Sequence, residues 1–364
     1  MNKMPMIQAD LNLLDHNARV LLKAAKRHGV QLAFVTKCVC ADPRIVNTLM
    51  AAGVTMLADA RVENLKKLSA GLPRLCLRLA DPAQAHQVVR HSEYSLQSEV
   101  AAIRMLGRAA RRQNRQHKVI LMIDLGDLRE GIFYQNTELI HQAAEAVLRE
   151  EGLVLEGIGT NLTCFGGILP TQKNLGVLVD IAEDLRNTFN IPLPLVSGGN
   201  SSSLQLLFEG RLPRGINHLR IGEALLLGTN TVDGSPFPQL SQQAFTQYAA
   251  LIETQNKPSK PIGETGPNAF GEMVEFEDKG PMRRGILAIG RQDTDPERLA
   301  PLDEEVSVLS GSSDHLLVDL SRAPQYHTGD VLGFTPGYGA LLRAYTSKYV
   351  SKSVIEQEKQ EADE

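Results

Sequence analysis

A lysine ends the first long apolar run of the chain. Lys37 directly follows QLAFVT, a run typical of a buried strand. An amine that is desolvated at such a position loses its charge readily and becomes a nucleophile toward aldehydes. A lysine that reaches solvent from the end of a strand has no such role. The position alone leaves both interpretations open.

Two later segments predict a site for a phosphate group. Ser197–Leu204 (SGGNSSSL) places glycines and hydroxyls before a helical pattern, and Arg220–Leu227 (RIGEALLL) places a glycine just after an arginine. We expect the backbone N–H groups of Gly222 and Glu223 and the Ser201 hydroxyl to bind a phosphate dianion. Taken alone, SGGNSSSL also fits an ordinary turn with a serine N-cap.

A nucleophilic amine and a phosphate site together define a ligand with an aldehyde at one end and a phosphate at the other. Pyridoxal 5′-phosphate (PLP) has this shape: Lys37 forms an imine with its aldehyde, and the ring then withdraws electrons from the substrate Cα. Arg220 is expected near the ring nitrogen, which it keeps unprotonated because an arginine does not give up its proton. That arrangement suits racemisation, which must avoid a long-lived carbanion. A salt bridge from Arg220 to Glu223 or Asp124 is the structural alternative.

The elements that must position these residues alternate short apolar runs with amphipathic helical patterns. Eight runs predict an α/β fold, a (β/α)8 barrel, with an additional helix at residues 12–27. The runs are Gln31–Lys37, Thr55–Ala60, Arg74–Ala80, Glu93–Gln97, Lys118–Leu125, Leu155–Leu162, Pro194–Gly198 and His218–Gly222. An open doubly wound sheet is disfavoured because no G-x-G-x-x-G follows the first run. In a barrel, active sites form at the carboxyl ends of the strands, with phosphate sites after strands 7 and 8.

After Gly228 the pattern changes to short strand-like segments punctuated by Gly and Pro, which predicts a smaller C-terminal β domain. The expected strands are Gly271–Phe276, Gly285–Ile289, Glu305–Leu309, His315–Leu320 and Asp330–Phe334. We therefore predict a PLP-binding barrel over residues 1–232, a β domain over residues 233–350 and an acidic tail over residues 351–364.

Composition excludes several classes of protein. With 364 residues, 43% of them hydrophobic and 22% charged, the chain fits a globular protein and not a collagen-like or disordered one. A net charge of −4 gives no footprint for nucleic acid, and no apolar run reaches the roughly 18 residues of a membrane helix. The four cysteines lack C-x-x-C spacing and the N-terminus lacks a signal-peptide pattern. We expect a cytoplasmic protein with reduced thiols.

Several segments resemble the alanine racemase family of fold type III PLP enzymes, and most of all its ornithine or amino-acid racemase branch. They are VTKCVCADPRIVNTLMAAGVTMLADARVENLKKL, IDLGDLREG, GIGTNLTCFGG, SGGNSSSL and NHLRIGEALLLG, with LAIGRQDTD and SDHLLVDLS in the β domain. The resemblance implies a PLP-dependent racemase that interconverts L- and D-amino acids by abstracting the Cα proton from an external aldimine. It also implies a head-to-tail homodimer.

The resemblance also implies roles for individual residues. Arg129 corresponds to an arginine that orients the substrate carboxylate and the cofactor hydroxyl, and Asn161 stands where alanine racemases carry a histidine under the ring. The other cofactor-binding positions implied are Lys37 for the imine, Arg220 for the ring nitrogen, and Ser201, Gly222 and Glu223 for the phosphate.

Asn161 and three further departures indicate that the chain is not an ordinary alanine racemase. Met122 replaces a lysine that some members carbamylate, and Ala41 replaces a phosphate-binding tyrosine. Arg291 replaces the tyrosine that serves as second catalytic base from the partner subunit, and an arginine is a poor base at neutral pH. Either another residue supplies the second acid or base, with Tyr349, His315, Asp314 and Cys164 as candidates, or the enzyme differs in chemistry. Tyr349 alternatively supplies the missing phosphate hydroxyl.

Acidic residues around Arg291 favour a basic substrate. We expect Arg291 to pair with the substrate carboxylate or with Asp293 or Asp295, and these acids, or Asp314, to bind the distal ammonium of ornithine or lysine. A PLP-binding homeostasis protein with little turnover is one alternative, although such proteins resemble the barrel alone. A D-threonine-aldolase-like lyase is another, but its metal-binding H-x-C-D motif is not in this sequence, and no metal is expected.

Overall fold

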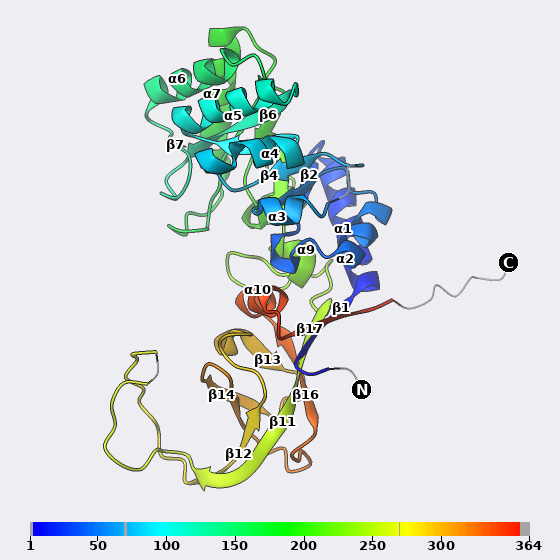
Figure 1. The fold of residues 1–364 in the computed structure, drawn as a ribbon, viewed down its shortest axis with the longest axis vertical. Helices are drawn as coiled ribbons and strands as arrows, with labels where there is room; N and C mark the ends of the chain where they lie inside the picture. Colours follow the sequence, from blue (N-terminus) through cyan, green and yellow to red (C-terminus); the bar gives the residue numbers. More distant parts are fainter. Residues whose placement is uncertain (1–2, 69–70, 269, 357–364) are drawn as a thin grey trace, which may run out of the picture. The chain divides into compact units, whose positions relative to one another are not determined.

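The computed structural model describes residues 3–68, 71–268 and 270–356 and divides the chain into two compact units (Figure 1). The barrel unit is Leu13–Gln242, and the β unit joins the residues up to Asn12 with those from Gln243 onward. The sequence-based division placed the boundary at residue 232 and the N-terminus with the barrel. Residues 357–364 of the predicted acidic tail lie outside the described residues.

Among the described residues of the barrel unit, eight parallel strands close into a ring, in which β5 pairs with β6. They are β2 (Gln31–Val35), β3 (Leu57–Asp59), β4 (Arg74–Cys76), β5 (Tyr94–Gln97), β6 (His117–Asp124), β8 (Leu153–Gly159), β9 (Leu195–Ser197) and β10 (His218–Ile221). The short strand β7 (Ile132–Phe133) pairs with β6 beside the ring. Each predicted run overlaps one of the eight strands, and the predicted fold class is confirmed.

Helices alternate with these strands. They are α1 (Leu11–Arg27), α2 (Pro43–Ala51), α3 (Val62–Leu65), α4 (Ala85–His91), α5 (Val100–Arg112), α6 (Thr137–Leu148), α7 (Gln172–Phe189), α8 (Leu204–Phe208) and α9 (Glu223–Leu227), with 3-10 turns η1 (Lys37–Val39), η2 (Pro82–Gln84) and η3 (Ser201–Ser203). The start of α2 shows the local cause: the Asp42 carboxylate accepts from Arg44 N, and Pro43 occupies the first turn.

A buried apolar cluster fills the barrel and explains the near-continuous apolar runs, because strands covered on both faces do not alternate. Its residues are Ala33, Val35, Met56, Ala58, Leu75, Leu96, Ile120, Met122 and Leu195. Met122 is thus part of this packing.

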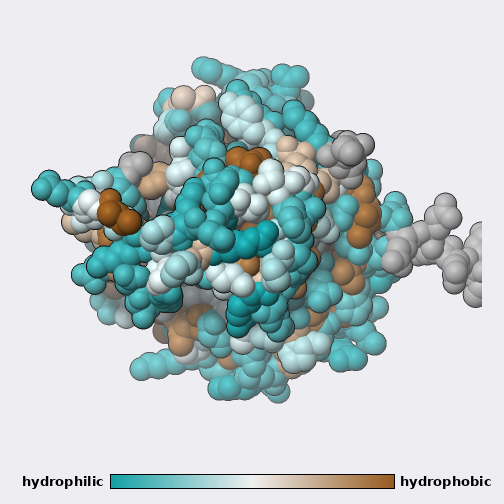
Figure 2. All heavy atoms as spheres, turned by 90° about the horizontal axis from the view of Figure 1, so that it is seen from below, coloured by the Kyte–Doolittle hydropathy of each residue, from teal (hydrophilic) through white to brown (hydrophobic). Residues whose placement is uncertain are grey.

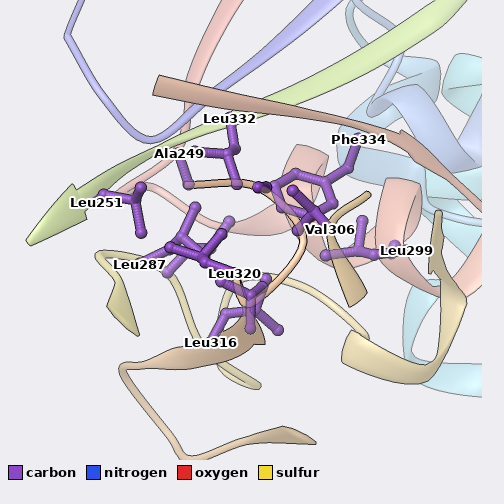
Figure 3. Close-up of a cluster of buried hydrophobic side chains, with 13 residues drawn as sticks. Ala249, Leu251, Leu287, Leu299, Val306, Leu316, Leu320, Leu332 and Phe334 are labelled. Carbon is purple, nitrogen blue, oxygen red and sulfur yellow. The ribbon is translucent and has the colours of Figure 1, made fainter. Parts of the chain in front are cut away.

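The β unit is a mainly antiparallel sheet around its own core (Figure 3). Its elements are β1 (Met6–Asp10), β11 (Phe245–Pro258), β12 (Pro281–Leu287), β13 (Leu299–Pro301), β14 (Ser307–Gly311), β15 (Leu316–Asp319), β16 (Val331–Pro336), α10 (Tyr338–Thr346) and β17 (Ser351–Ile355). Leu251, Leu287, Leu316 and Phe334 are almost fully buried in that core.

Three features of the β unit differ from the sequence-based expectation. The strand expected at Gly271–Phe276 is wrong, because residues 271–279 pair with no strand among the described residues and lie exposed. The long strand β11 was not predicted. Strand β17 occupies residues assigned to the acidic tail and pairs in parallel with β1, Met6 opposite Ser351. The two paired strands lie near opposite ends of the chain, so no local sequence pattern predicts this pairing.

The surface in Figure 2 is mostly hydrophilic, with small separate hydrophobic patches. Large apolar side chains are exposed on the loop between β11 and β12, namely Ile262, Phe270, Met273, Val274 and Phe276. None of the helices that the structure describes is long and apolar enough to cross a membrane.

Candidate functional site

Lys37 lies just beyond β2, at the first residue of η1. Positive φ values at Cys40 (50°) and Ala41 (51°) turn the backbone back after this residue. The Lys37 side chain is exposed and makes no hydrogen bond or ion pair with the residues that the structure describes. The prediction that the Lys37 amine is desolvated is therefore wrong. The amine is still available to react, because none of the described residues binds it.

Arg220 is buried near the carboxyl end of β10, with 4% of its surface exposed. Its Nη1 donates to Ser197 Oγ at 2.5 Å, and its Nη2 donates to the Thr160 carbonyl at 2.6 Å. Within the described part of the chain it makes no ion pair with Glu223 or Asp124, so the structural alternative is wrong. Burial lowers the pKa of Arg220 to about 10, which leaves the guanidinium charged at neutral pH.

Backbone donors converge on the Ser201 hydroxyl between β9 and β10. Ser201 Oγ accepts from Gly222 N at 3.3 Å and from Ala224 N at 3.4 Å. The sequence predicts that Gly222 and Glu223 donate to a phosphate, and these contacts to Ser201 leave that prediction untested. A Cβ added at Gly222 would lie 3.2 Å from Val35 Cβ, and the neighbouring Ser202 hydroxyl is buried without a partner among the described residues.

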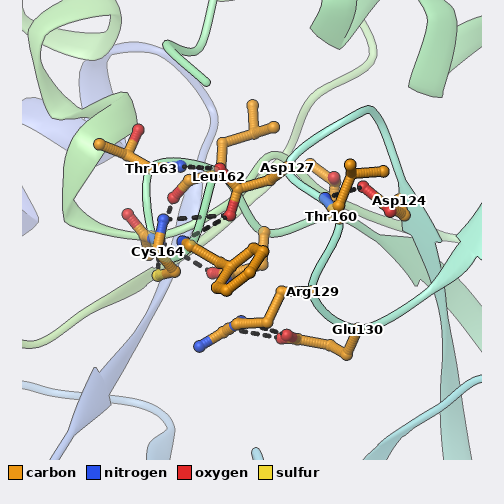
Figure 4. Close-up of polar contacts among 12 residues, drawn as sticks. Asp124, Asp127, Arg129, Glu130, Thr160, Leu162, Thr163 and Cys164 are labelled. Atoms are coloured by element: carbon orange, nitrogen blue, oxygen red, sulfur yellow. Dashed lines mark hydrogen bonds and ion pairs between the residues drawn. The ribbon is translucent and has the colours of Figure 1, made fainter. Parts of the chain in front are cut away.

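Arg129 and Asn161 meet beyond β6 and β8. Arg129 Nη2 donates to Glu130 Oε1 at 2.6 Å (Figure 4). The buried Asn161 amide accepts from Arg129 when its oxygen faces the guanidinium, and it also contacts Asn200. Asn200 Nδ2 approaches Cys164 Sγ at 3.3 Å, and Cys164 is exposed.

Asp127 organises the loop that carries Cys164, and sequence reasoning missed it. Its buried carboxylate accepts from four backbone N–H groups, those of Thr163 (3.1 Å), Cys164 (3.1 Å), Phe165 (3.0 Å) and Ile168 (3.1 Å) (Figure 4). The local pattern around Asp127 resembles an ordinary polar turn, because all four donors come from a segment about 40 residues further along the chain.

Arg291 belongs to the β unit, where it is held by groups other than those expected. Its Nε donates to the Gly311 carbonyl at 2.8 Å, its guanidinium forms an ion pair with Glu297, and its Cζ lies 5.0 Å from the centre of the Phe270 ring. The expected pairing was with the substrate carboxylate or with Asp293 or Asp295, and among the described residues Arg291 pairs with neither of these two acids. Glu297 was missed because the polar segment QDTDPE offers three acids.

The other acids and bases proposed for the β unit are exposed. Tyr349 is 53% exposed, and Lys348 Nζ lies 5.1 Å from the centre of its ring. Asp314 accepts from Gln292 Nε2 at 3.0 Å and from Ser313 Oγ at 2.9 Å. His315 is exposed as well.

The barrel fold thus gathers part of the predicted site. Lys37, Ser201 and Arg220 lie at or just beyond the carboxyl ends of the adjacent strands β2, β9 and β10. Arg291, Asp314 and Tyr349 belong to the other compact unit, the β unit. Over the residues that the structure describes, no group of three or more His, Cys, Asp or Glu side chains is arranged to hold a metal ion.

The structure is that of a (β/α)8-barrel protein with a lysine, an arginine and a small-residue loop at the carboxyl end of the barrel. Comparison with known proteins identifies its family. Residues 9–230 match the model of the alanine racemase N-terminal domain. The chain is 42% identical to ornithine racemase of Acetoanaerobium sticklandii, over 96% of this chain and 99% of that protein. It is 38% identical to lysine racemase of Thermotoga maritima, over 96% and 98%.

A solved structure supports the fold. The alanine racemase of Bartonella henselae with covalently bound pyridoxal phosphate superposes with a TM-score of 0.70 at 15% identity, covering 97% of this chain and 100% of that one. The chain belongs to the alanine racemase family. It is an amino-acid racemase, as the sequence had predicted.

Proposed function

We propose that the chain racemises a basic amino acid, ornithine or lysine, with PLP bound at the carboxyl end of the barrel. The names of the two relatives support the substrate class, and the PLP bound to the Bartonella henselae enzyme supports the cofactor. The observation that carries the proposal is that Arg220 is buried and charged and has no carboxylate partner among the described residues. Lys37 and Ser201 follow the two strands that neighbour the strand of Arg220.

The residues present fit PLP. Two backbone N–H groups already point at one small oxygen, Ser201 Oγ, and the adjacent Ser202 hydroxyl is buried without a partner in the described chain. Such a donor set suits a phosphate. Gly222 keeps its backbone close to Val35, where the Cβ of a larger residue would lie within 3.2 Å of Val35 Cβ. Strand β10 lies between β9, which precedes this loop, and β2, which precedes Lys37. Lys37 offers an exposed amine that makes no hydrogen bond with the described residues.

When bound, PLP supplies an electron sink for the substrate Cα. Lys37 holds or takes a proton on one face of that carbon. Arg220 keeps its own proton, so it leaves the ring nitrogen unprotonated and limits the build-up of negative charge on the ring. Arg129, next to Asn161, orients the substrate carboxylate, and Glu223 contributes to the phosphate end.

The β unit supplies the remaining groups in this proposal, from the partner of a cytoplasmic head-to-tail homodimer. Arg291 is proposed to reach the substrate side, and Asp314 to bind the distal ammonium of ornithine or lysine. Tyr349 provides either the acid or base for the second face of the Cα or a hydroxyl for the phosphate. Its exposed hydroxyl is compatible with both.

The absorbance spectrum of the purified protein tests the cofactor and its lysine. A band near about 420 nm is expected with PLP and is expected to vanish in Lys37→Ala. Lys66→Ala is the matched control, since Lys66 is an exposed lysine on the same unit. Exchange of the Cα hydrogen in heavy water is then followed with ornithine, lysine and alanine enantiomers. A colourless wild-type protein, or exchange with alanine alone, would refute the corresponding half of the proposal.

A further inference from the structure

We propose that His218 is a positioning residue for Arg220 and acts through the hydroxyl of Ser197. The inference rests on the proposed function, since it concerns the arginine assigned to the cofactor ring. Ser197 ends β9, whereas His218 and Arg220 lie two residues apart on β10, so both side chains point to the same face of that strand.

The three side chains form a continuous hydrogen-bonded relay inside the barrel unit. Arg220 Nη1 lies 2.5 Å from Ser197 Oγ, and Ser197 Oγ lies 2.8 Å from His218 Nδ1. Ser197, His218 and Arg220 are exposed by 0%, 1% and 4%, so water does not compete with these contacts. His218 Nε2 has no partner in the described structure.

The chemistry of the guanidinium fixes the direction of the first hydrogen bond, and the relay assigns the second. A guanidinium only donates, so the Ser197 oxygen accepts from Arg220. The single Ser197 proton then needs an acceptor, and His218 Nδ1 provides it if that nitrogen carries no proton. Burial, and secondarily the charge of Arg220, lowers the pKa of His218 to about 3, which agrees with the neutral ring that the relay requires.

The relay has a consequence for the bound cofactor. Ser197 holds one Nη group of Arg220 and the Thr160 carbonyl holds the other, so the guanidinium plane is fixed from two sides. Without the His218 acceptor, the Ser197 hydroxyl loses the contact that orients its proton. Its oxygen then no longer presents a fixed lone pair to Arg220. The arginine then loses a fixed orientation toward whatever lies at the mouth of the barrel.

The chain contains a matched control. His117 lies on β6, is fully buried, and contacts Ser95 Oγ through Nε2 at 2.8 Å. Burial lowers its pKa to about 4. Ser95 continues to the Gln97 amide at 3.1 Å and not to an arginine. Loss of His117 therefore disturbs a buried His–Ser pair of the same kind without touching Arg220.

Three variants of the full-length protein separate positioning from packing. His218→Leu removes the acceptor, His218→Asn restores one because Asn Oδ1 takes the place of His Nδ1, and His117→Leu is the control. Each is examined for its thermal midpoint without cofactor, for its dissociation constant for PLP, and for the pH dependence of the bound-cofactor absorbance band. Ser197→Ala cuts the relay with less change of volume and replaces His218→Leu if that variant does not fold.

We expect His218→Leu and Ser197→Ala to weaken PLP binding by about tenfold and to shift the pH dependence of the band, as loss of one buried hydrogen bond of the relay predicts. His218→Asn is expected to recover most of both properties. His117→Leu is expected to lower the thermal midpoint and leave both cofactor readouts unchanged. Equal effects of His117→Leu and His218→Leu on those readouts would overturn the relay, as would no effect of His218→Leu. Wild-type protein that binds no PLP would instead overturn the proposed function itself.

Discussion

The carboxylate of Asp127 is the most sharply testable feature of the barrel mouth. Asp127→Asn keeps the size of the side chain and replaces one acceptor oxygen with an NH2 group. The two oxygens now serve the N–H groups of Thr163 and Ile168 on one side and of Cys164 and Phe165 on the other. In the variant, one of these pairs faces a donor.

The structure sets the size of the effect. Hydrogen bonds to a charged group contribute about 1.5–3 kcal/mol each. Cys164 and Phe165 are exposed, so water can satisfy their N–H groups after opening and the lower value applies. Two lost bonds then destabilise the loop by about 3 kcal/mol, which raises its opening equilibrium constant by roughly 100-fold.

Hydrogen–deuterium exchange read residue by residue is the assay. The amides of residues 163, 164, 165 and 168 are expected to exchange about 100-fold faster in Asp127→Asn, whereas the strands of the barrel keep their protection. Asp81→Asn is the control, since Asp81 caps η2 by accepting from Ala83 N and asparagine caps equally well. Unchanged exchange in this loop, or equal acceleration throughout the barrel, would show that Asp127 does not hold the loop.

Two further perturbations follow from the site. Burial lowers the pKa of His117 to about 4 and that of His218 to about 3; the unfolded chain, with ordinary values near about 6.5, takes up protons first as the pH falls. The stability that the two neutral histidines contribute is therefore fully present above about pH 6.5. It is lost toward acid by about 1.4 kcal/mol per pH unit per histidine. Urea titrations at several pH values should show this slope, and the double variant His117→Gln, His218→Asn should flatten it. Arg291→Ala is expected to lower kcat by about tenfold or more while the dissociation constant for PLP changes little; steady-state rates and cofactor titration check this, and equal losses would remove Arg291 from the substrate side.

The barrel was predictable because its information is local. Each strand is an apolar run bounded by helix signals such as Asp42-Pro43, and burial on both faces makes the runs continuous. The β unit was less predictable because its pairings join distant segments. The exposed run Gly271–Phe276 has the composition of a strand and lacks a partner among the described residues, whereas the polar β17 is a strand because β1 lies beside it.

The same distinction applies within the site. Residue type and position at a strand end were enough to single out Lys37 and Arg220, because a barrel directs all such positions to one face. What the sequence could not reveal is which groups hold the buried Arg220 guanidinium. Salt bridges were the natural expectation for a buried guanidinium, yet it is held by a serine hydroxyl and a backbone carbonyl. A guanidinium that is hydrogen-bonded but not ion-paired keeps its charge, and its orientation is set by Ser197 and the Thr160 carbonyl. This is why we expect the contacts that position Arg220 to affect how the cofactor is bound.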